Sequence, residues 1–246
     1  MMRKKVILLS GPSCVGKTPL LRALSRTNPE IKWGRPILYT SRQPRPGESE
    51  GVDYHFLSDA EIRSLPYERF VVAKTRHIWQ AVDLDELGEL LHQYDCLIYD
   101  VHPVLAAALR EHPRLKGRDE LQIVRVFLQP ATLEEIEELR SAMPESSLQE
   151  ATAALMTPKL IARALQQGTP LTPEVLQDIR IRAARAWEEI LIGASYDYIL
   201  INHDGEDSPH WQETPPSGDA GRTLEQFVHI LVKKSDDENN ENRRSE

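Results

Sequence analysis

The stretch that decides the fold is VILLSGPSCVGKTPLLRAL, residues 6–24. Residues 6–9 are all apolar, which is typical of a strand buried on both faces of a sheet. Residues 11–18 match the pattern G-x-x-x-x-G-K-[ST] at every fixed position, and the leucines that follow recur at helical spacing. A buried strand, a glycine-bounded loop and a helix in this order predict a loop that binds the phosphates of a nucleotide.

Each fixed position of this loop has its own physical reason. Gly11 and Gly16 permit backbone angles that point consecutive amides at phosphate oxygens, and a helix starting near Gly16 adds free N–H groups. Lys17 is expected to reach the β- and γ-phosphates, and the Thr18 hydroxyl to bind Mg²⁺. The alternative is a turn that only closes a βα unit, which would leave Lys17 and Thr18 without a folding role. The residues expected to bind ATP here are Gly11, Ser13, Cys14, Val15, Gly16, Lys17 and Thr18.

Strands and helices alternate along the rest of the chain. Apolar runs predict further buried strands at residues 96–99, 123–128 and 196–201. Helical spacing predicts helices at residues 16–25, 84–92, 103–110, 133–140 and 173–192. Because such alternation builds right-handed βαβ units, we expect an α/β fold with a central parallel sheet.

Three segments interrupt the alternation. Residues 35–82 hold a Pro/Gly-rich turn and short β-like runs, which predict a small antiparallel subdomain. Residues 141–172 are rich in Ala, Gln and Leu and predict a helical insertion. Residues 203–222 are a polar loop that we expect to be mobile, ahead of a last packing helix at 223–233.

The charge balance excludes some partners. The chain has 38 acidic against 30 basic side chains, a net charge of −8, so general attraction to nucleic acid or to an anionic membrane is not expected. Much of the excess lies in residues 235–246, which we expect to be a disordered acidic tail behind one domain of residues 1–234. An anionic substrate must then be held by local clusters of Arg and Lys.

Cysteine usage and the start of the chain indicate the compartment. Cys14 and Cys96 form neither a disulfide framework nor a metal-ligand spacing, so we expect a reducing cytoplasm and no structural metal. At Cys14 an inert small side chain is favoured over a reactive thiol. The first apolar run is too short for a signal peptide, and no stretch approaches the roughly 18 apolar residues of a membrane span. We therefore expect a cytoplasmic protein; its oligomeric state is not set by the sequence.

A second metal ligand should be an acid at the end of a neighbouring strand. Asp100 ends the apolar run 96–99 and is the best candidate for that role. The competing interpretation is that Asp100 caps the helix that follows, ahead of Pro103.

The next informative block is YTSRQPRPGESEGVDYHF, residues 39–56. Arg42 and Arg45 are separated by Gln-Pro and can form a clamp on a monophosphate, because the planar guanidinium fork matches phosphate oxygens. Prolines and a glycine stiffen the turn. Glu48 can support an arginine or contact the ligand, and Tyr54 can donate its hydroxyl to the phosphate. Composition alone is equally compatible with an exposed basic loop.

This block resembles the nucleoside-monophosphate-binding signature of guanylate kinases, T-[TS]-R-x-P-R-x-G-E-x-x-G-x-D-Y-x-F. Residues 127–135, 182–190 and 196–202 are similar to later parts of that family, so the likeness spans roughly residues 4–204. It implies a three-layer P-loop kinase fold, in which 35–82 is the subdomain that binds the monophosphate and 141–172 is a helical lid.

The resemblance also implies roles for individual residues. By that likeness Arg42, Arg45 and Tyr54 hold the acceptor phosphate, with Glu48 beside them. Arg140 and Arg182 neutralise the transferring phosphoryl group, and Asn202 lies near the adenine of ATP. The implied reaction is in-line transfer of the γ-phosphoryl from Mg·ATP to a nucleoside monophosphate, GMP in the first instance, with Mg²⁺ as cofactor.

Departures from the family pattern fall on the side that reads the base. Leu38 stands where the family has a serine, and residues 70–72 lack the family's acid. Residues 77–81 read HIWQA where the family has G-x-Y-G-[TS], and His102 or Ile98 replaces a second acid. Trp79, within that segment, can stack on a base or pack in the core. Two alternatives therefore stay open: a sister kinase for another phosphorylated acceptor, and an inactive binding module.

Overall fold

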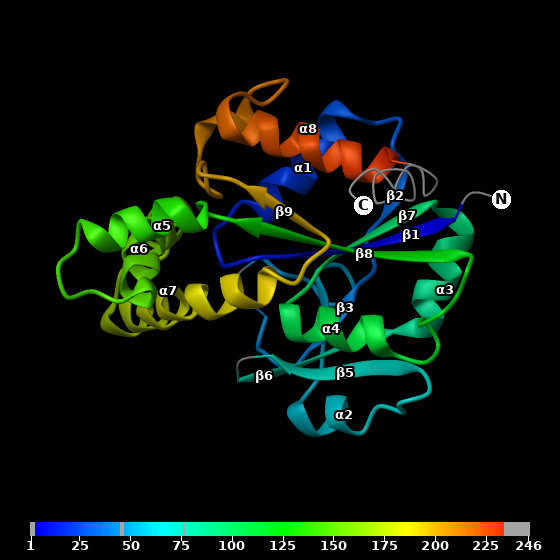
Figure 1. Cartoon of the computed structure of the whole chain (residues 1–246). Coiled ribbons are helices and arrows are strands. Elements are labelled where there is room, and N and C mark those ends of the chain that lie inside the picture. The colour runs from blue at the N-terminus through cyan, green and yellow to red at the C-terminus, as the bar shows by residue number, and fades with distance from the viewer. Residues whose placement is uncertain (1–2, 45–46, 76, 234–246) are drawn as a thin grey trace. The chain divides into compact units, whose positions relative to one another are not determined.

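The chain crosses repeatedly between two units, each of which is described separately. The computed structural model describes residues 3–44, 47–75 and 77–233. The first unit comprises Met1–Leu9 and Lys32–Arg125, and the second comprises Ser10–Ile31 and Val126–Glu246. Figure 1 shows the helices and strands with their labels.

A parallel sheet forms the core of the first unit. Its strands are β1 (Lys4–Ser10), β7 (Cys96–Asp100), the short β2 (Trp33–Gly34) and the start of β8 (Leu121–Gln129), in the order β2-β7-β1-β8. β1 pairs in parallel with β7, with Ile7 opposite Ile98, and both side chains are fully buried. The buried parallel strands predicted at 6–9 and 96–99 are confirmed; β2 is an addition.

The second sheet of this unit is mixed. Its strands are β3 (Leu38–Thr40), β4 (Tyr54–Phe56), β5 (Phe70–Thr75) and β6 (Ile78–Asp83), in the order β4-β3-β6-β5. β6 pairs antiparallel with both β3 and β5, whereas β4 pairs in parallel with β3. The prediction of an antiparallel subdomain is therefore wrong for the pair β3 and β4, which is parallel. The connection between β3 and β4 is long enough for the crossover that a parallel pair requires.

Helices of the first unit begin at side-chain caps. They are α2 (Asp59–Arg63), α3 (Leu84–Gln93) and α4 (Pro103–Glu111), capped by Ser58, Asp83 and His102. Ile62 of α2 packs with Phe70 and Ala81, and Trp79 packs against this cluster. The structure therefore favours core packing over base stacking for Trp79.

In the second unit, β8 continues and pairs in parallel with β9 (Tyr198–Ile201), with Phe127 opposite Ile199. The unit also holds α1 (Lys17–Thr27), a short 3-10 turn η1 (Pro209–Gln212) and α8 (Gly218–Val232). Trp211 of η1 is only 1% exposed and donates from Nε1 to the Gly205 carbonyl at 2.7 Å. The loop expected to be mobile is thus anchored in the core, and the last helix starts earlier than its apolar pattern indicates.

The insertion is helical, as predicted. It follows α5 (Leu133–Ser141) and contains α6 (Leu148–Gln166), which packs along α7 (Pro173–Gly193) (Figure 1). Ser147 and Glu150 form a capping box that starts α6, and Thr172 caps α7. In the part of the chain that the structure describes, no helix combines the length and the apolar character needed to cross a bilayer.

Candidate active site

The two glycines of the phosphate loop are required by close contacts in the second unit. Gly11 has φ 147°, and a Cβ there would lie 2.4 Å from the carbonyl oxygen of Leu128 in β8. Gly16 has φ 102°, and a Cβ there would lie 2.5 Å from Nδ2 of Asn202. Any side chain at either position would therefore collide with fixed neighbours as well as strain the backbone. The loop is held against β8 and the end of β9.

The start of α1 is open to an anion. Gly16 is the N-cap residue and has no side chain with which to satisfy the first N–H groups of the helix. Lys17 is half-buried, and its Nζ donates to the carbonyls of Gly11 at 2.7 Å and Pro12 at 3.1 Å. Thr18 is exposed on the first turn. An ammonium group, free amides and a hydroxyl thus gather at one helix end, the combination that binds nucleotide phosphates.

Cys14 is the one loop residue whose environment the sequence did not indicate. It has φ 67°, a left-handed conformation that costs a non-glycine residue roughly 1–2 kcal/mol. Its side chain is 2% exposed and packs with residues of α6 and α7, among them Leu160 and Ala183. Burial raises the pKa of the Cys14 thiol, although the Arg163 guanidinium acts in the opposite direction. The thiol is therefore protonated at neutral pH, which favours the inert interpretation.

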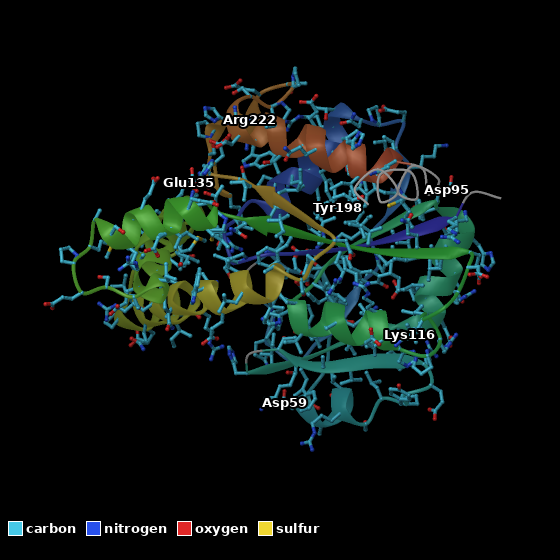
Figure 2. The ribbon with its side chains drawn as sticks, in the orientation of Figure 1. Asp59, Asp95, Lys116, Glu135, Tyr198 and Arg222 are labelled. Carbon is cyan, nitrogen blue, oxygen red and sulfur yellow. The ribbon has the colours of Figure 1, made fainter. Side chains whose placement is uncertain are left out.

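Asn202, which follows β9, supports the phosphate loop through a hydrogen bond. Its side chain is fully buried, and Nδ2 donates to the Val15 carbonyl at 2.7 Å. The next residue, His203, lies between two carboxylates, at 2.9 Å from Glu135 and 2.5 Å from Asp219. Figure 2 labels Glu135 at the start of α5. The segment after β9 is therefore fixed on both sides, and it fixes the phosphate loop in turn.

The expected lid arginines are paired along their own helices. Arg140 near the end of α5 forms an ion pair with Glu137, and Arg182 on α7 forms one with Asp178 at 2.5 Å. The Arg182 side chain is 25% exposed. Both side chains are partly exposed, and each guanidinium group pairs with a carboxylate of its own helix.

Three of the residues expected to bind the acceptor, Arg42, Glu48 and Tyr54, lie together in the first unit. Arg42 makes a bidentate ion pair with Glu48, both N–O distances being 2.6 Å, and also donates to the Gln43 carbonyl. Its guanidinium lies 4.6 Å from the centroid of the Tyr54 ring. Burial alone would lower the pKa of Arg42, but hydrogen bonds and the charge of Glu48 raise it overall. Glu48 thus supports the arginine, one of the two roles that the sequence allows.

A small hollow lies beside this pair. It is lined by Arg35, Pro36, Leu38, Asp53, Tyr54 and Asp100. Burial raises the pKa of Tyr54, and the nearby Asp100 carboxylate raises it further. The phenol is therefore a neutral donor at physiological pH. Arg35, which is exposed, is a basic residue that the motifs did not indicate, because it lies outside the signature block.

Asp100 does not cap the following helix. It is partly buried at the end of β7, and the cap of α4 is instead His102, whose Nδ1 accepts from Val104 N at 3.3 Å. The capping interpretation of Asp100 is therefore wrong, and its role as a metal ligand stays a prediction. Leu38 is buried in β3, and residues 70–72, which lack the acid expected from the family pattern, lie at the start of β5. Arg45 lies outside the described residues, as does the acidic tail.

A parallel sheet, a glycine-bounded loop at a strand end and an open helix N-terminus define a phosphate-loop nucleotide-binding protein. The family model for guanylate kinase matches residues 3–166. A guanylate kinase of Mycolicibacterium paratuberculosis is 33% identical over 201 residues, covering 80% of this chain and 74% of that one. A guanylate kinase of Symbiobacterium thermophilum is 30% identical over 207 residues, covering 81% and 78%. The chain belongs to the guanylate kinase family.

The fold agrees with this membership. The crystal structure of guanylate kinase from Anaplasma phagocytophilum superposes with a TM-score of 0.53 at 19% identity, covering 94% of this chain and 88% of that chain. At that identity the likeness bears on the fold alone. The predicted P-loop kinase fold with its central parallel sheet is thereby confirmed.

Proposed function

We propose that this nucleoside-monophosphate kinase transfers the γ-phosphoryl group of Mg·ATP to GMP. The observation that carries the proposal is the arrangement of Arg42, which Glu48 and Tyr54 hold in a fixed orientation beside the Asp100 hollow. A rigid guanidinium fork presented in this way suits a phosphate dianion, because little side-chain freedom is left to lose on binding.

The donor is assigned to the second unit. The amides of the phosphate loop and of the first turn of α1 receive the β- and γ-phosphates, and Lys17 exchanges its two carbonyl contacts for phosphate oxygens. Arg140 and Arg182 are proposed to neutralise charge on the phosphoryl group during transfer. To do so, each arginine would give up the ion pair that it forms with a carboxylate of its own helix. Asn202 is proposed to help set the adenine side, and its buried Oδ1 has no hydrogen-bond partner among the described atoms.

The donor set fits magnesium. Mg²⁺ takes oxygen ligands and is commonly held by one or two protein groups together with phosphates and waters. The exposed Thr18 hydroxyl of the second unit is an oxygen donor of this kind, and so is the Asp100 carboxylate of the first unit, which is not used as a cap; each is proposed separately as a ligand. When bound, the metal neutralises charge on the β- and γ-phosphates.

The acceptor phosphate is assigned to Arg42, Arg45 and Tyr54. Contacts with Glu48 and the Gln43 carbonyl account for three of the five N–H groups of Arg42, and a hydrogen bond to Tyr54 uses a fourth, so that a phosphate would bind to the remaining N–H and by exchange with these contacts. The neutral Tyr54 hydroxyl donates a further hydrogen bond. Glu48 orients the arginine rather than binding the ligand.

A second candidate is transfer to a different phosphorylated acceptor. It is favoured by the base side of the site, where Leu38 is buried and apolar, and where His102 is engaged as a helix cap. A pocket without partners for the polar groups of a base loses discrimination by orders of magnitude. Arg35, at the same hollow, offers a charge that an acidic or additionally phosphorylated acceptor would use.

A coupled assay of ADP release tests both candidates. The purified chain is given Mg·ATP with GMP, AMP, CMP, UMP and sugar phosphates in turn. Turnover with GMP at least tenfold above the rest supports the first candidate, and preference for another monophosphate supports the second. If no acceptor is phosphorylated at ATP concentrations that saturate binding, both candidates are wrong and the chain is an inactive binding module.

A further inference from the structure

Helix α6 of the insertion is docked directly on the phosphate loop. Cys14 lies in one buried cluster with Met156 and Leu160 of α6 and with Ile179 and Ala183 of α7. The cluster is formed entirely within the second unit. The insertion, which was expected to act as a lid, therefore includes a helix, α6, that packs directly against the phosphate loop.

Polar contacts on one face of α6 extend this docking. Lys159, Arg163 and Gln166 are spaced four and three residues apart, so they share a helix face. Lys159 donates to the His203 carbonyl, and Gln166 donates to the Asp207 carbonyl at 3.2 Å. This face thus follows the segment after β9, the same segment that supports the phosphate loop.

Arg163 stands at the centre of that face. Its guanidinium donates to the Cys14 Sγ at 3.6 Å and pairs with the Glu206 carboxylate at 3.5 Å. The backbone N–H of Glu206 in turn donates to the Cys14 carbonyl at 3.0 Å. The side chain and the carbonyl of Cys14 are therefore both held by one linked set, Arg163 and Glu206.

This set acts on a residue whose conformation needs support. Cys14 has φ 67°, a region that non-glycine residues avoid unless the surroundings impose it. The amides on either side of Cys14 belong to the loop that wraps the phosphates. Loss of the left-handed conformation at this position would redirect them.

We propose that Arg163 is a positioning residue for the nucleotide donor: from the inserted helix α6, through Cys14 and Glu206, it keeps the phosphate loop in its binding conformation. Affinity falls in proportion to the fraction of molecules with a competent loop. Without Arg163, we expect that fraction to fall about tenfold, equivalent to about 1.4 kcal/mol. The proposal rests on nucleotide binding by the loop, which is part of the proposed function.

The test is equilibrium titration with Mg·ADP in the absence of any acceptor, so that it does not depend on turnover. Arg163→Ala should raise the Kd for Mg·ADP about tenfold. Arg180→Ala, which removes an exposed arginine from the neighbouring helix α7, is the matched control and should leave the Kd within twofold. Arg163→Gln keeps most of the side-chain bulk and should weaken binding in the same direction if the alanine variant does not fold.

A second substitution separates positioning from direct contact with the nucleotide. Glycine adopts φ 67° without strain, so Cys14→Gly in the Arg163→Ala background should restore the Kd to within about threefold of the original value. An unchanged Kd in both Arg163 variants would overturn the proposal. Weakened binding that Cys14→Gly does not restore would also overturn it, since Arg163 would then act on the nucleotide itself.

The outcome can be told apart from failure of the proposed function. If the original chain binds Mg·ADP but phosphorylates no acceptor, the proposed reaction fails while the Arg163 comparison still gives its answer. If the original chain shows no affinity for Mg·ADP at millimolar concentration, both proposals fall together.

Discussion

The phosphate loop and the acceptor sheet depend on the sequence in different ways. The loop is proposed to work mainly through backbone groups, and its geometry leaves no room for added side chains: a Cβ would lie 2.4 Å from a neighbouring atom at Gly11 and 2.5 Å at Gly16. The sheet β4-β3-β6-β5, which we call the acceptor sheet, is proposed to work through side chains, above all Arg42 held by Glu48 and Tyr54. A site built from backbone groups tolerates few substitutions at the positions that fix its geometry. A site built from separate side chains can lose one contact with its ligand and keep the others.

This difference explains why the two regions diverge unequally from the family pattern. The loop matches at every fixed position. In the acceptor sheet the arginine that we propose to bind phosphate and its support are present. Leu38 stands where the family pattern has a serine, and His102 or Ile98 stands where it has a second acid. A site whose parts are separate side chains can retain its phosphate clamp and still change its acceptor.

The largest expected effect is in the loop. Lys17→Ala should lower kcat by about 10³-fold or more, because it removes the ammonium group that is proposed to stabilise charge on the β- and γ-phosphates from within the phosphate loop. The variant should fold, since Lys17 contacts only two loop carbonyls. Steady-state kinetics with saturating ATP and acceptor checks the rate, and circular dichroism checks the fold. Lys74→Ala, which removes an exposed lysine from β5, is the control and should retain full activity.

A smaller effect is expected at the clamp. Arg42→Ala should raise the acceptor KM about 10- to 100-fold, the range for loss of hydrogen bonds to a charged group, while the Kd for Mg·ADP stays unchanged. Acceptor-dependent kinetics and the ADP titration measure the two separately. Arg63→Ala, at an exposed arginine of the same unit, should change neither. An acceptor KM unaffected by Arg42→Ala would remove the clamp assignment.

Two glycine substitutions compare the regions directly. Gly11→Ala should destabilise the fold by about 2–4 kcal/mol, because its Cβ would lie 2.4 Å from the Leu128 oxygen in addition to the backbone strain at φ 147°. Gly47→Ala in the acceptor turn has φ 87° but open space around the new Cβ, so it should cost only about 1–2 kcal/mol. Urea unfolding of both variants gives the difference. Equal costs would show that the packing around Gly11 relaxes freely.

Much of the fold could be predicted because local pattern and long-range structure agree. The apolar runs at 6–9, 96–99 and 123–128 are strands of the parallel sheet as predicted, and the loop motif fixed the position of α1. The run at 196–201 also contains a strand, β9, but the prediction that it is buried was wrong, since Ile199 is 43% exposed. The parallel pairing of β4 with β3 could not be predicted, since short β-like runs carry no information on direction. The same holds for the anchoring of the 203–222 loop, which depends on one tryptophan, Trp211.

In the candidate site, too, the residues within motifs could be predicted, whereas the contacts between distant segments could not. Motif spacing placed Lys17 and Arg42 without help from the fold. The docking of α6 on Cys14 could not be predicted, because it joins positions far apart in the chain and no motif covers the insertion. The capping role of His102 was hidden for a different reason: a histidine is an uncommon cap, so the sequence pointed to the nearby aspartate.

The smallest expected effect concerns an ion pair at the end of the acceptor sheet. Asp83 is 3% exposed, caps α3 through the amides of Asp85 and Glu86, and pairs with Arg69 at 2.6 Å. Burial acts to raise the pKa of Asp83, but the hydrogen bonds from Arg69 and from the two amides bring it below its ordinary value. A carboxyl group with a depressed folded pKa adds stability above its unfolded pKa of about 3.9, and that stability is lost as the pH falls through the folded pKa.

Asp83→Asn keeps an oxygen for the cap and removes the charge. It should cost about 1 kcal/mol at pH 7, a modest value because the Arg69 side chain is 51% exposed, and less at pH 2, because the contribution of the charge declines as the pH falls toward and through the folded pKa. Urea titrations of the original chain and the variant at both pH values measure this. Gly11→Ala serves as the comparison from the other region, since its clash involves no titrating group and should cost the same at both pH values. A pH-independent cost for Asp83→Asn would assign the contribution of Asp83 to packing, and the contrast between a backbone-built loop and a charge-supported sheet would fail at this position.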